Sequence, residues 1–254
     1  MTFVRETSVY GYLLDIRNQK GAGFMVLIDP DRSARRDMRD QARACETAGV
    51  DAILVGTSLM MADGFDETIG LLKDSVSIPV IIFPGEKSHV TRNADAILFL
   101  SLLSGRNPDL LIGEQIKSAP LVRSLGLEAI STAYLLIDSG RMTSVEYMSN
   151  TKPIPSDKPE IAVAHALAAE IFGMKMVYLE AGSGAGRPVP DEVVRAVSSS
   201  VGIPVIVGGG IRSPETVAET VRAGASFVVV GNHLEQDANR SVLKAMVDAC
   251  RQKK

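Results

Sequence analysis

The chain lacks tryptophan altogether, and aromatic residues make up only 5% of its 254 residues. It contains just two cysteines, Cys45 and Cys250, and neither lies in a CxxC motif or a cysteine–histidine cluster. The sequence therefore excludes a disulfide-stabilised scaffold. We expect two free thiols, both in helices, and a location in a reducing compartment, the cytoplasm.

Long apolar and long basic segments are missing as well. No stretch approaches the roughly 18 uninterrupted apolar residues of a membrane span. The first residues, Met1 to Glu6, include an acid and no long apolar run, which argues against a signal peptide. The net charge is −3, and the basic residues cluster only at 251–254. We expect no membrane span and no nucleic-acid partner.

Aliphatic residues are abundant instead. Apolar residues make up 46% of the chain, enough for a large buried core, and their low aromatic share suits a parallel sheet covered by helices. The length is close to the roughly 250 residues typical of a (β/α)₈ barrel. We therefore expect one domain spanning residues 1–254.

Short apolar runs that look like buried strands alternate with helical segments such as Arg35–Ala48 and Pro190–Val201. The runs are Phe24–Asp29, Ala52–Thr57, Val80–Phe83, Ile97–Leu102, Ala129–Ile137, Met176–Glu180, Val205–Gly208 and Phe227–Gly231. Eight such units predict an α/β fold, the (β/α)₈ TIM barrel. An extra N-terminal helix, Ser8–Asn18, precedes the first strand and is expected to close the barrel floor.

Glycine marks the ends of the last strands. Gly208, Gly209 and Gly210 end the seventh, and Ser213-Pro214-Glu215 then starts a helix with a cap and a first-turn proline. Bare backbone next to a helix N-terminus favours anion binding, and Gly231-Asn232 ends the eighth strand in the same way. The pattern predicts a phosphate site after strands seven and eight. A purely structural role in tight turns is the alternative.

Acidic residues stand at two other strand ends. Glu180 lies in an apolar strand, so it is a candidate catalytic base, and Tyr178 points the same way by period two. Asp29, at the end of strand one, and Ser58, after strand two, could bind Mg²⁺ together with substrate phosphates. Glu180 in a structural salt bridge, and Asp29 in an ordinary turn, remain the alternatives.

Two further features are less specific. The polar segment Asp138–Pro159 follows strand five and is predicted to be a lid, a binding loop or a surface excursion. Of the three histidines, His89 and His165 are expected in surface or core roles, whereas His233 follows Gly231-Asn232 and is a candidate neighbour of the site.

Taken together, these motifs resemble the geranylgeranylglyceryl phosphate synthase family, which includes the bacterial heptaprenylglyceryl phosphate synthases. The resemblance covers nearly the whole chain. It is carried by Ile28-Asp29-Pro30-Asp31, Gly56-Thr57-Ser58-Leu59-Met60, Tyr178-Leu179-Glu180-Ala181-Gly182-Ser183-Gly184, Gly208-Gly209-Gly210-Ile211-Arg212 and Gly231-Asn232. The chain has Leu27 where the shorter, Bacillus-like branch has a lysine, so it looks more like the longer, archaeal-type branch.

The resemblance implies a Mg²⁺-dependent prenyltransferase of phospholipid biosynthesis, which joins sn-glycerol 1-phosphate to geranylgeranyl diphosphate through an ether bond. It implies self-association into dimers or hexamers. Asp29 and Ser58 match the metal positions. The glycerol phosphate site is matched by Tyr178, Leu179, Glu180, Ala181, Gly182, Ser183, Gly184, Gly208, Gly209, Gly210, Gly231 and Asn232.

The prenyl chain requires an apolar groove, for which Phe83, Phe99, Leu102 and Tyr134 are candidates alongside a plain core role. Two rival functions remain at this point. One is another phosphate-binding TIM-barrel isomerase or lyase of amino-acid or cofactor biosynthesis, and the other is a non-catalytic sensor of a phosphorylated ligand.

Overall fold

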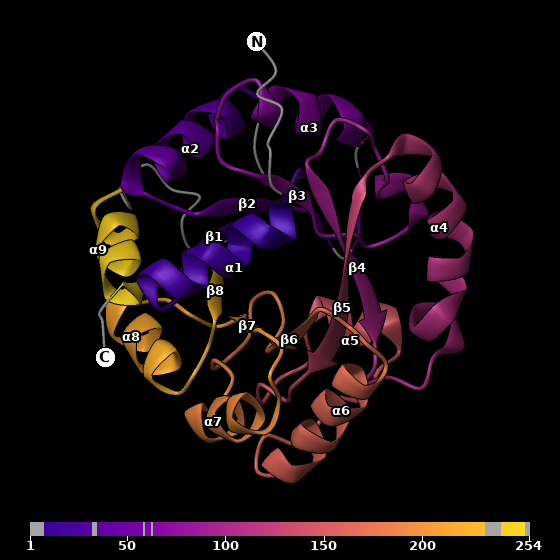
Figure 1. The fold of residues 1–254 in the computed structure, drawn as a ribbon, viewed down its shortest axis with the longest axis vertical. Coiled ribbons are helices and arrows are strands. Elements are labelled where there is room, and N and C mark those ends of the chain that lie inside the picture. The colour runs from indigo at the N-terminus through magenta and orange to yellow at the C-terminus, as the bar shows by residue number, and fades with distance from the viewer. Residues whose placement is uncertain (1–7, 32–34, 58, 62, 232–239, 252–254) are drawn as a thin grey trace.

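The computed structural model describes residues 8–31, 35–57, 59–61, 63–231 and 240–251. Eight parallel strands pair in chain order, and β8 pairs with β1, so the sheet closes into a barrel surrounded by helices (Figure 1). The predicted TIM barrel is confirmed, and the predicted strands and N-terminal helix end within two residues of the observed ones.

The strands are β1 (Gly23–Ile28), β2 (Ala52–Val55), β3 (Val80–Ile82), β4 (Ala96–Leu102), β5 (Glu128–Leu136), β6 (Met176–Glu180), β7 (Val205–Gly208) and β8 (Phe227–Val230). The α-helices are α1 (Val9–Lys20), α2 (Arg35–Ala48), α3 (Phe65–Lys73), α4 (Glu114–Leu125), α5 (Ser144–Ser149), α6 (Pro159–Ile171), α7 (Asp191–Ser200), α8 (Pro214–Arg222) and α9 (Arg240–Cys250). A 3₁₀ turn, η1 (Lys87–His89), follows β3, and a π-helical turn, η2 (Asp109–Gly113), precedes α4.

Alternate side chains on each strand build two apolar layers. On β1, Met25 belongs to the cluster inside the barrel, whereas Val26 and Ile28 pack in the layer beneath the helices. β6 repeats the pattern, with Tyr178 inside and Leu179 outside. Each fully buried aliphatic side chain stabilises the fold by about 1.5–3 kcal/mol, so the two layers fix which strand residues face the barrel interior.

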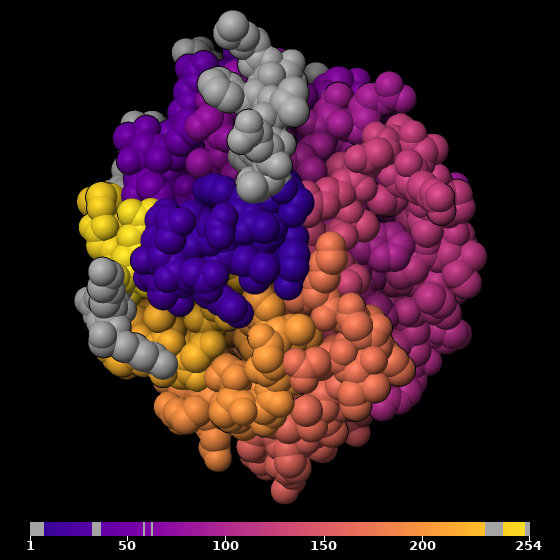
Figure 2. Space-filling model, in the orientation of Figure 1, coloured from indigo at the N-terminus to yellow at the C-terminus, as the bar shows by residue number. Residues whose placement is uncertain are grey.

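Helix α1 closes the amino-terminal end of the barrel. Ser8 caps it by accepting a hydrogen bond from Gly11 N–H, and Val9 and Leu13 pack into the inner cluster. The first free N–H groups of the helix, those of Val9 and Tyr10, donate to the Glu128 carboxylate at the start of β5, at 2.6 and 3.0 Å. Figures 1 and 2 show α1 lying across the middle of this face. The expectation that it closes the barrel floor is confirmed.

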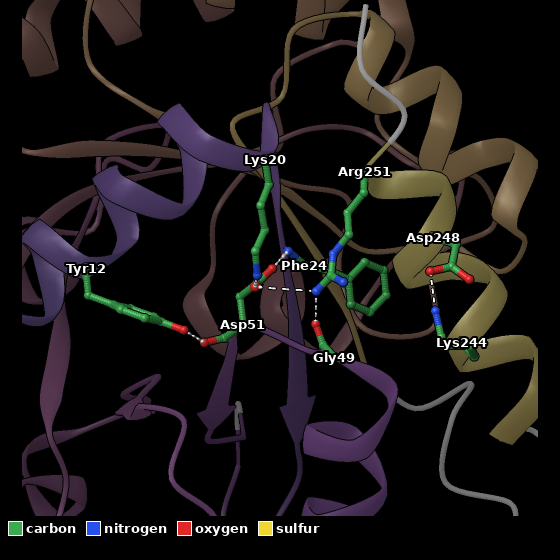
Figure 3. Close-up of polar contacts among 8 residues, drawn as sticks. All are labelled: Tyr12, Lys20, Phe24, Gly49, Asp51, Lys244, Asp248 and Arg251. Atoms are coloured by element: carbon green, nitrogen blue, oxygen red, sulfur yellow. Dashed lines mark hydrogen bonds and ion pairs between the residues drawn. The ribbon is translucent and has the colours of Figure 1, made fainter. Parts of the chain in front are cut away.

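A buried carboxylate joins this end of the barrel to the C-terminal helix (Figure 3). Asp51, 2% exposed, accepts from Phe24 N–H at 2.9 Å and pairs with Lys20 at the end of α1. Arg251, which follows α9, lies 3.8 Å from the same carboxylate and donates to the carbonyl of Gly49. These contacts connect α1, β1 and the residue before β2 with the end of α9.

The segment 138–159 after β5 is more ordered than its composition suggests. Thr143 caps α5 within it, and Asn150 ends that helix with φ of 48°. Ile154 then forms a parallel bridge with Ile137, extending the pairing beyond β5. The described part of the chain contains no helix that is both long enough and apolar enough to cross a bilayer.

Candidate active site

A cavity of about 1280 Å³ lies over the carboxyl ends of the strands. One part of its lining is rich in glycine and comes from the turns after β6, β7 and β8, and another part is apolar and comes mainly from β3, β4 and β5. Most of the residues proposed from sequence line it: Asp29, Tyr178, Glu180, Gly182, Ser183, Gly184, Gly209, Gly210 and Gly231. The fold therefore brings together motifs that are far apart in the sequence.

The turn after β7 requires glycine for both conformation and space. Gly209 has φ of 81° and Gly210 has φ of 71°. A Cβ on Gly209 would lie 2.3 Å from Glu180 Oε1 and 2.7 Å from the backbone nitrogen of Gly182. Ser213 caps α8 by accepting from Thr216 N–H, as the sequence predicts. The bare backbone of the turn thus lies between the Glu180 carboxylate and the start of α8, a combination suited to an anion.

Glu180, at the end of β6, is 6% exposed. Its Oε1 accepts a hydrogen bond of 2.6 Å from Gly182 N–H. Burial raises the pKa of the Glu180 carboxyl to about 7, although the Gly182 hydrogen bond opposes the rise. No salt bridge to Glu180 occurs within the described ranges. A carboxyl group with a pKa near neutrality is suited to proton transfer in a reaction.

Tyr178 lies beside Glu180 in the barrel interior, at 0% exposure. Its ring stacks on Tyr134 at 5.5 Å and packs against Phe83 at 5.4 Å. Burial, and then the charge of Glu180, raises the pKa of Tyr178 well above its ordinary value, so the hydroxyl stays protonated. That hydroxyl has no hydrogen-bond partner of good geometry among the residues the structure describes. A buried donor of this kind is available to a ligand.

Three other positions from the same motifs differ in placement. Leu179 and Ala181 pack in the outer layer under the helices and do not line the cavity. Gly208 lies in β7, where a Cβ would come within 2.3 Å of the Tyr178 hydroxyl, so it leaves room for that side chain. Tyr178 and Glu180 both point into the barrel while Leu179 between them points outward, so the predicted common direction of Tyr178 and Glu180 is confirmed.

Acidic residues line the cavity where β1 ends. The Asp29 carboxylate accepts from Asp31 N–H at 3.0 Å, and the Asp31 carboxylate accepts from Met61 N–H at 2.6 Å. Within the described ranges, no group of three or more histidine, cysteine, aspartate or glutamate side chains is placed to hold a metal ion. Ser58, Asn232 and His233 lie outside the described residues.

The four candidates for the prenyl groove, Phe83, Phe99, Leu102 and Tyr134, all line the cavity. Leu27 lines it too, so the position at which the Bacillus-like branch has a lysine faces the cavity. Asp31 and Arg212, quoted above only as parts of motifs, line the cavity as well, as does His89, expected in a surface or core role. The sequence pattern did not single out two further lining residues, Gln115 and Thr143. Gln115 and Thr143 lie at helix starts outside these motifs, and only a general expectation that loops after strands form the site could have indicated them.

Fold and site together define a TIM-barrel enzyme whose cavity combines glycine-rich turns with a buried carboxyl group. Comparison with known proteins then identifies the family. A family model described as the PcrB family matches residues 14–250, and the chain belongs to this family.

Similar proteins support this assignment over nearly the full length. A protein of Chitinophaga pinensis named geranylgeranylglyceryl phosphate synthase is 47% identical over 241 residues, which cover 95% of each chain. A protein of the same name from Pyrococcus horikoshii is 43% identical over 228 residues, 89% of each chain. The crystal structure of (S)-3-O-geranylgeranylglyceryl phosphate synthase from Thermoplasma acidophilum in complex with sn-glycerol-1-phosphate has a TM-score of 0.91 at 35% identity, covering 97% of this chain and 100% of that one. The resemblance inferred from the motifs is confirmed.

Proposed function

We propose that this protein is a geranylgeranylglyceryl phosphate synthase. It forms an ether bond between sn-glycerol 1-phosphate and geranylgeranyl diphosphate and releases diphosphate. One observation carries the proposal: a single cavity combines glycine-rich turns, a buried carboxyl group and an apolar wall. The names of the relatives, and the ligand of the Thermoplasma acidophilum enzyme, agree with this arrangement.

The glycerol phosphate binds with its phosphate at the turns after β6, β7 and β8. The proposed contacts come from Tyr178 to Gly184, Gly208 to Gly210, Gly231 and Asn232. Leu179 and Ala181 take part through their backbone, because their side chains pack away from the cavity. Amide groups and the N-terminus of α8 favour a doubly charged phosphate.

Glu180 acts as the base. It takes the proton from the C3 hydroxyl of the glycerol, and the hydroxyl oxygen forms the new bond to C1 of the prenyl chain. The bond between C1 and the diphosphate oxygen breaks, and diphosphate leaves with that electron pair. Positioned proton transfer of this kind accelerates a reaction by about 10²–10⁴-fold. The Tyr178 hydroxyl lies beside the carboxylate, where it can donate to the bound glycerol phosphate.

Magnesium is the proposed cofactor, held by Asp29 and Ser58. The donors that the structure describes fit a hard cation, because Asp29 and Asp31 present carboxylate oxygens to the cavity. When bound, Mg²⁺ would neutralise charge on the leaving diphosphate. One or two carboxylates plus phosphate oxygens of the substrate are the usual ligands of such an ion.

The apolar wall positions the prenyl chain and keeps water from the reacting carbon. Phe83 and Tyr134 pack against each other at 6.0 Å and lie next to Tyr178, so the wall begins directly beside the proposed base. Phe99 and Leu102 continue it along β4. Exclusion of water matters because water would otherwise compete with the glycerol hydroxyl for the prenyl group.

The proposal is tested first by product identity. Purified protein is given a ladder of prenyl diphosphates with each enantiomer of glycerol phosphate, with and without Mg²⁺, and the products are identified by mass. A geranylgeranyl ether of sn-glycerol 1-phosphate, formed only with Mg²⁺, is expected. Absence of any prenyl ether would contradict the proposal.

The role of Glu180 is tested by Glu180→Gln, which keeps the shape of the side chain but removes its basicity. We expect turnover to fall by about 10²–10⁴-fold. The affinity for sn-glycerol 1-phosphate, measured by calorimetry, should change little because the turns that bind the phosphate remain. Glu160→Gln, on the exposed surface of α6, is the matched control and should keep full activity. Equal losses of affinity and of turnover would instead indicate a structural role for Glu180.

We also propose that the protein self-associates into dimers or hexamers in the cytoplasm. Large apolar side chains at the end of α6, Ile171 and Phe172, are 82% and 72% exposed, which favours a protein contact. Both cysteines are free and buried, which suits a reducing compartment. Sedimentation equilibrium measures the oligomeric state, and cell fractionation measures the location.

A further inference from the structure

His89 ends the η1 turn after β3 and is 1% exposed. Its ring stacks on Phe65, the first residue of α3, with centroids 4.7 Å apart and planes 18° from parallel. The backbone N–H of Gly85 donates to Nδ1 at 3.0 Å. Stacking and hydrogen bonding together fix both the position and the orientation of the ring.

The Gly85 hydrogen bond also determines where the ring carries its proton. Nδ1 accepts a hydrogen bond, so in the neutral imidazole the proton is on Nε2, which is then a donor. Burial lowers the pKa of His89, and this favours the neutral ring. Nε2 has no hydrogen-bond partner within the described part of the chain. A buried donor without a partner is unfavourable, so it points to a group that binds there.

The surroundings of His89 indicate which ligand this is. His89 lines the cavity, as do Asp29 and Asp31. The charge of Asp31 acts on the imidazole, and a Cβ on Gly85 would lie 2.6 Å from the carbonyl oxygen of Thr57. The ends of β1, β2 and β3 therefore converge here, away from the turns after β6, β7 and β8 proposed for glycerol phosphate.

We propose that His89 is a substrate-binding residue whose Nε2–H donates a hydrogen bond to the diphosphate of the prenyl substrate. The inference rests on the proposed function and adds a residue to it. A neutral donor suits this position, because it binds a diphosphate oxygen without repelling the cation that balances the diphosphate charge. A lysine or arginine here would compete with that cation for Asp29 and Asp31.

Two substitutions separate the donor from the fixed acceptor. Asparagine places its amide oxygen where histidine has Nδ1, and its side chain ends before the Nε2 position. His89→Asn therefore keeps an acceptor for Gly85 N–H but has no donor at the Nε2 position. Glutamine reaches further, and its amide nitrogen takes the place of Nε2, so His89→Gln keeps the donor. Binding of inorganic diphosphate with Mg²⁺ to the purified full-length protein is measured by calorimetry, and binding of sn-glycerol 1-phosphate serves as the internal control.

We expect His89→Asn to weaken diphosphate binding by about tenfold or more, as for loss of a hydrogen bond to a charged group. His89→Gln should retain most of the affinity, and both variants should bind sn-glycerol 1-phosphate like the unmodified protein. The KM for the prenyl diphosphate should rise in His89→Asn more than in His89→Gln.

Unchanged diphosphate binding in His89→Asn would overturn the inference. Equal loss of affinity for both ligands in both variants would overturn it too, because it would show a merely structural role. If the unmodified protein bound no diphosphate at all, the proposed function itself would fail, and this result is distinguishable from the other two.

Discussion

At the scale of single residues, the raised pKa of Glu180 has an energetic consequence. Burial moves the pKa of this carboxyl from an ordinary value near 4.5 to about 7. Between these values the folded protein holds a proton that the unfolded chain has released, so stability falls as the pH rises. The difference corresponds to about 3 kcal/mol once both states are ionised.

The pH dependence of stability therefore reports on Glu180. Glu180→Gln does not titrate, so we expect it to be as stable as the unmodified protein near pH 4 and more stable by about 3 kcal/mol at pH 8. Urea denaturation of both proteins across this range gives the free energy of unfolding. A difference that does not grow with pH would show that the carboxyl group is ionised without penalty in the folded state.

Sequence reasoning found Glu180 because a carboxylate in an apolar strand is unusual, and it found the glycines because they follow strand ends. It did not find His89, whose importance depends on two facts invisible in the sequence. These are the Gly85 N–H that fixes the tautomer and the lack of a partner for Nε2 among the described residues. Contacts between loops of different strands set both, and no local pattern encodes them.

At the scale of elements, the turn after β7 is the most constrained segment of the site. Gly209 combines a φ of 81° with a Cβ position 2.3 Å from Glu180 Oε1. Gly209→Ala would strain the backbone and displace the carboxylate. We expect it to lower both the affinity for sn-glycerol 1-phosphate and the turnover by at least about tenfold, because the turn and the carboxylate both move, and to lower the free energy of unfolding by about 1–2 kcal/mol through the backbone strain.

Gly70→Ala is the control for this substitution. Gly70 lies inside α3, and the nearest heavy atom to a Cβ there is Asn93 Nδ2, at 3.9 Å. Alanine should therefore stabilise the protein by about 0.5–1 kcal/mol and leave activity unchanged. Calorimetric binding and steady-state kinetics compare the two variants. Normal binding by Gly209→Ala would argue against a phosphate at this turn.

The regular elements could be predicted because their patterns are strong. Eight apolar runs, with helical segments between most of them, leave few topologies, and all eight are strands. The six-residue helix α5 was not predicted, because the polar residues around it favour an irregular loop in isolation. Its Thr143 cap and the Ile154–Ile137 bridge become effective only once β5 is in place.

At the scale of the whole molecule, the Asp51 contacts connect both ends of the chain. Asp51→Asn removes the charge that balances Lys20 and Arg251 but keeps the shape of the side chain. We expect it to lower the free energy of unfolding by about 2 kcal/mol, less than for a fully buried pair because both cations are about one-third exposed. Turnover of the folded variant should be normal, because these residues lie at the end of the barrel opposite the cavity.

Asp248→Asn makes the same chemical change in a different setting (Figure 3). Asp248 pairs with Lys244 on the surface of α9, and both side chains are more than half exposed. Such pairs contribute at most about 0.5 kcal/mol. Urea denaturation should therefore separate the two variants clearly. Equal losses would mean that burial of Asp51 adds nothing to the strength of its contacts.

The position of α1 also affects how molecules move through the enzyme. Because the helix closes one end of the barrel, substrates and products enter and leave through the opposite end, where the cavity opens. The product keeps the whole prenyl chain, so it has to leave by the path along which the next prenyl diphosphate arrives. Product release and substrate binding therefore compete for the same opening. The rate at which the cavity becomes free again depends on how quickly the lipid product is removed from this opening.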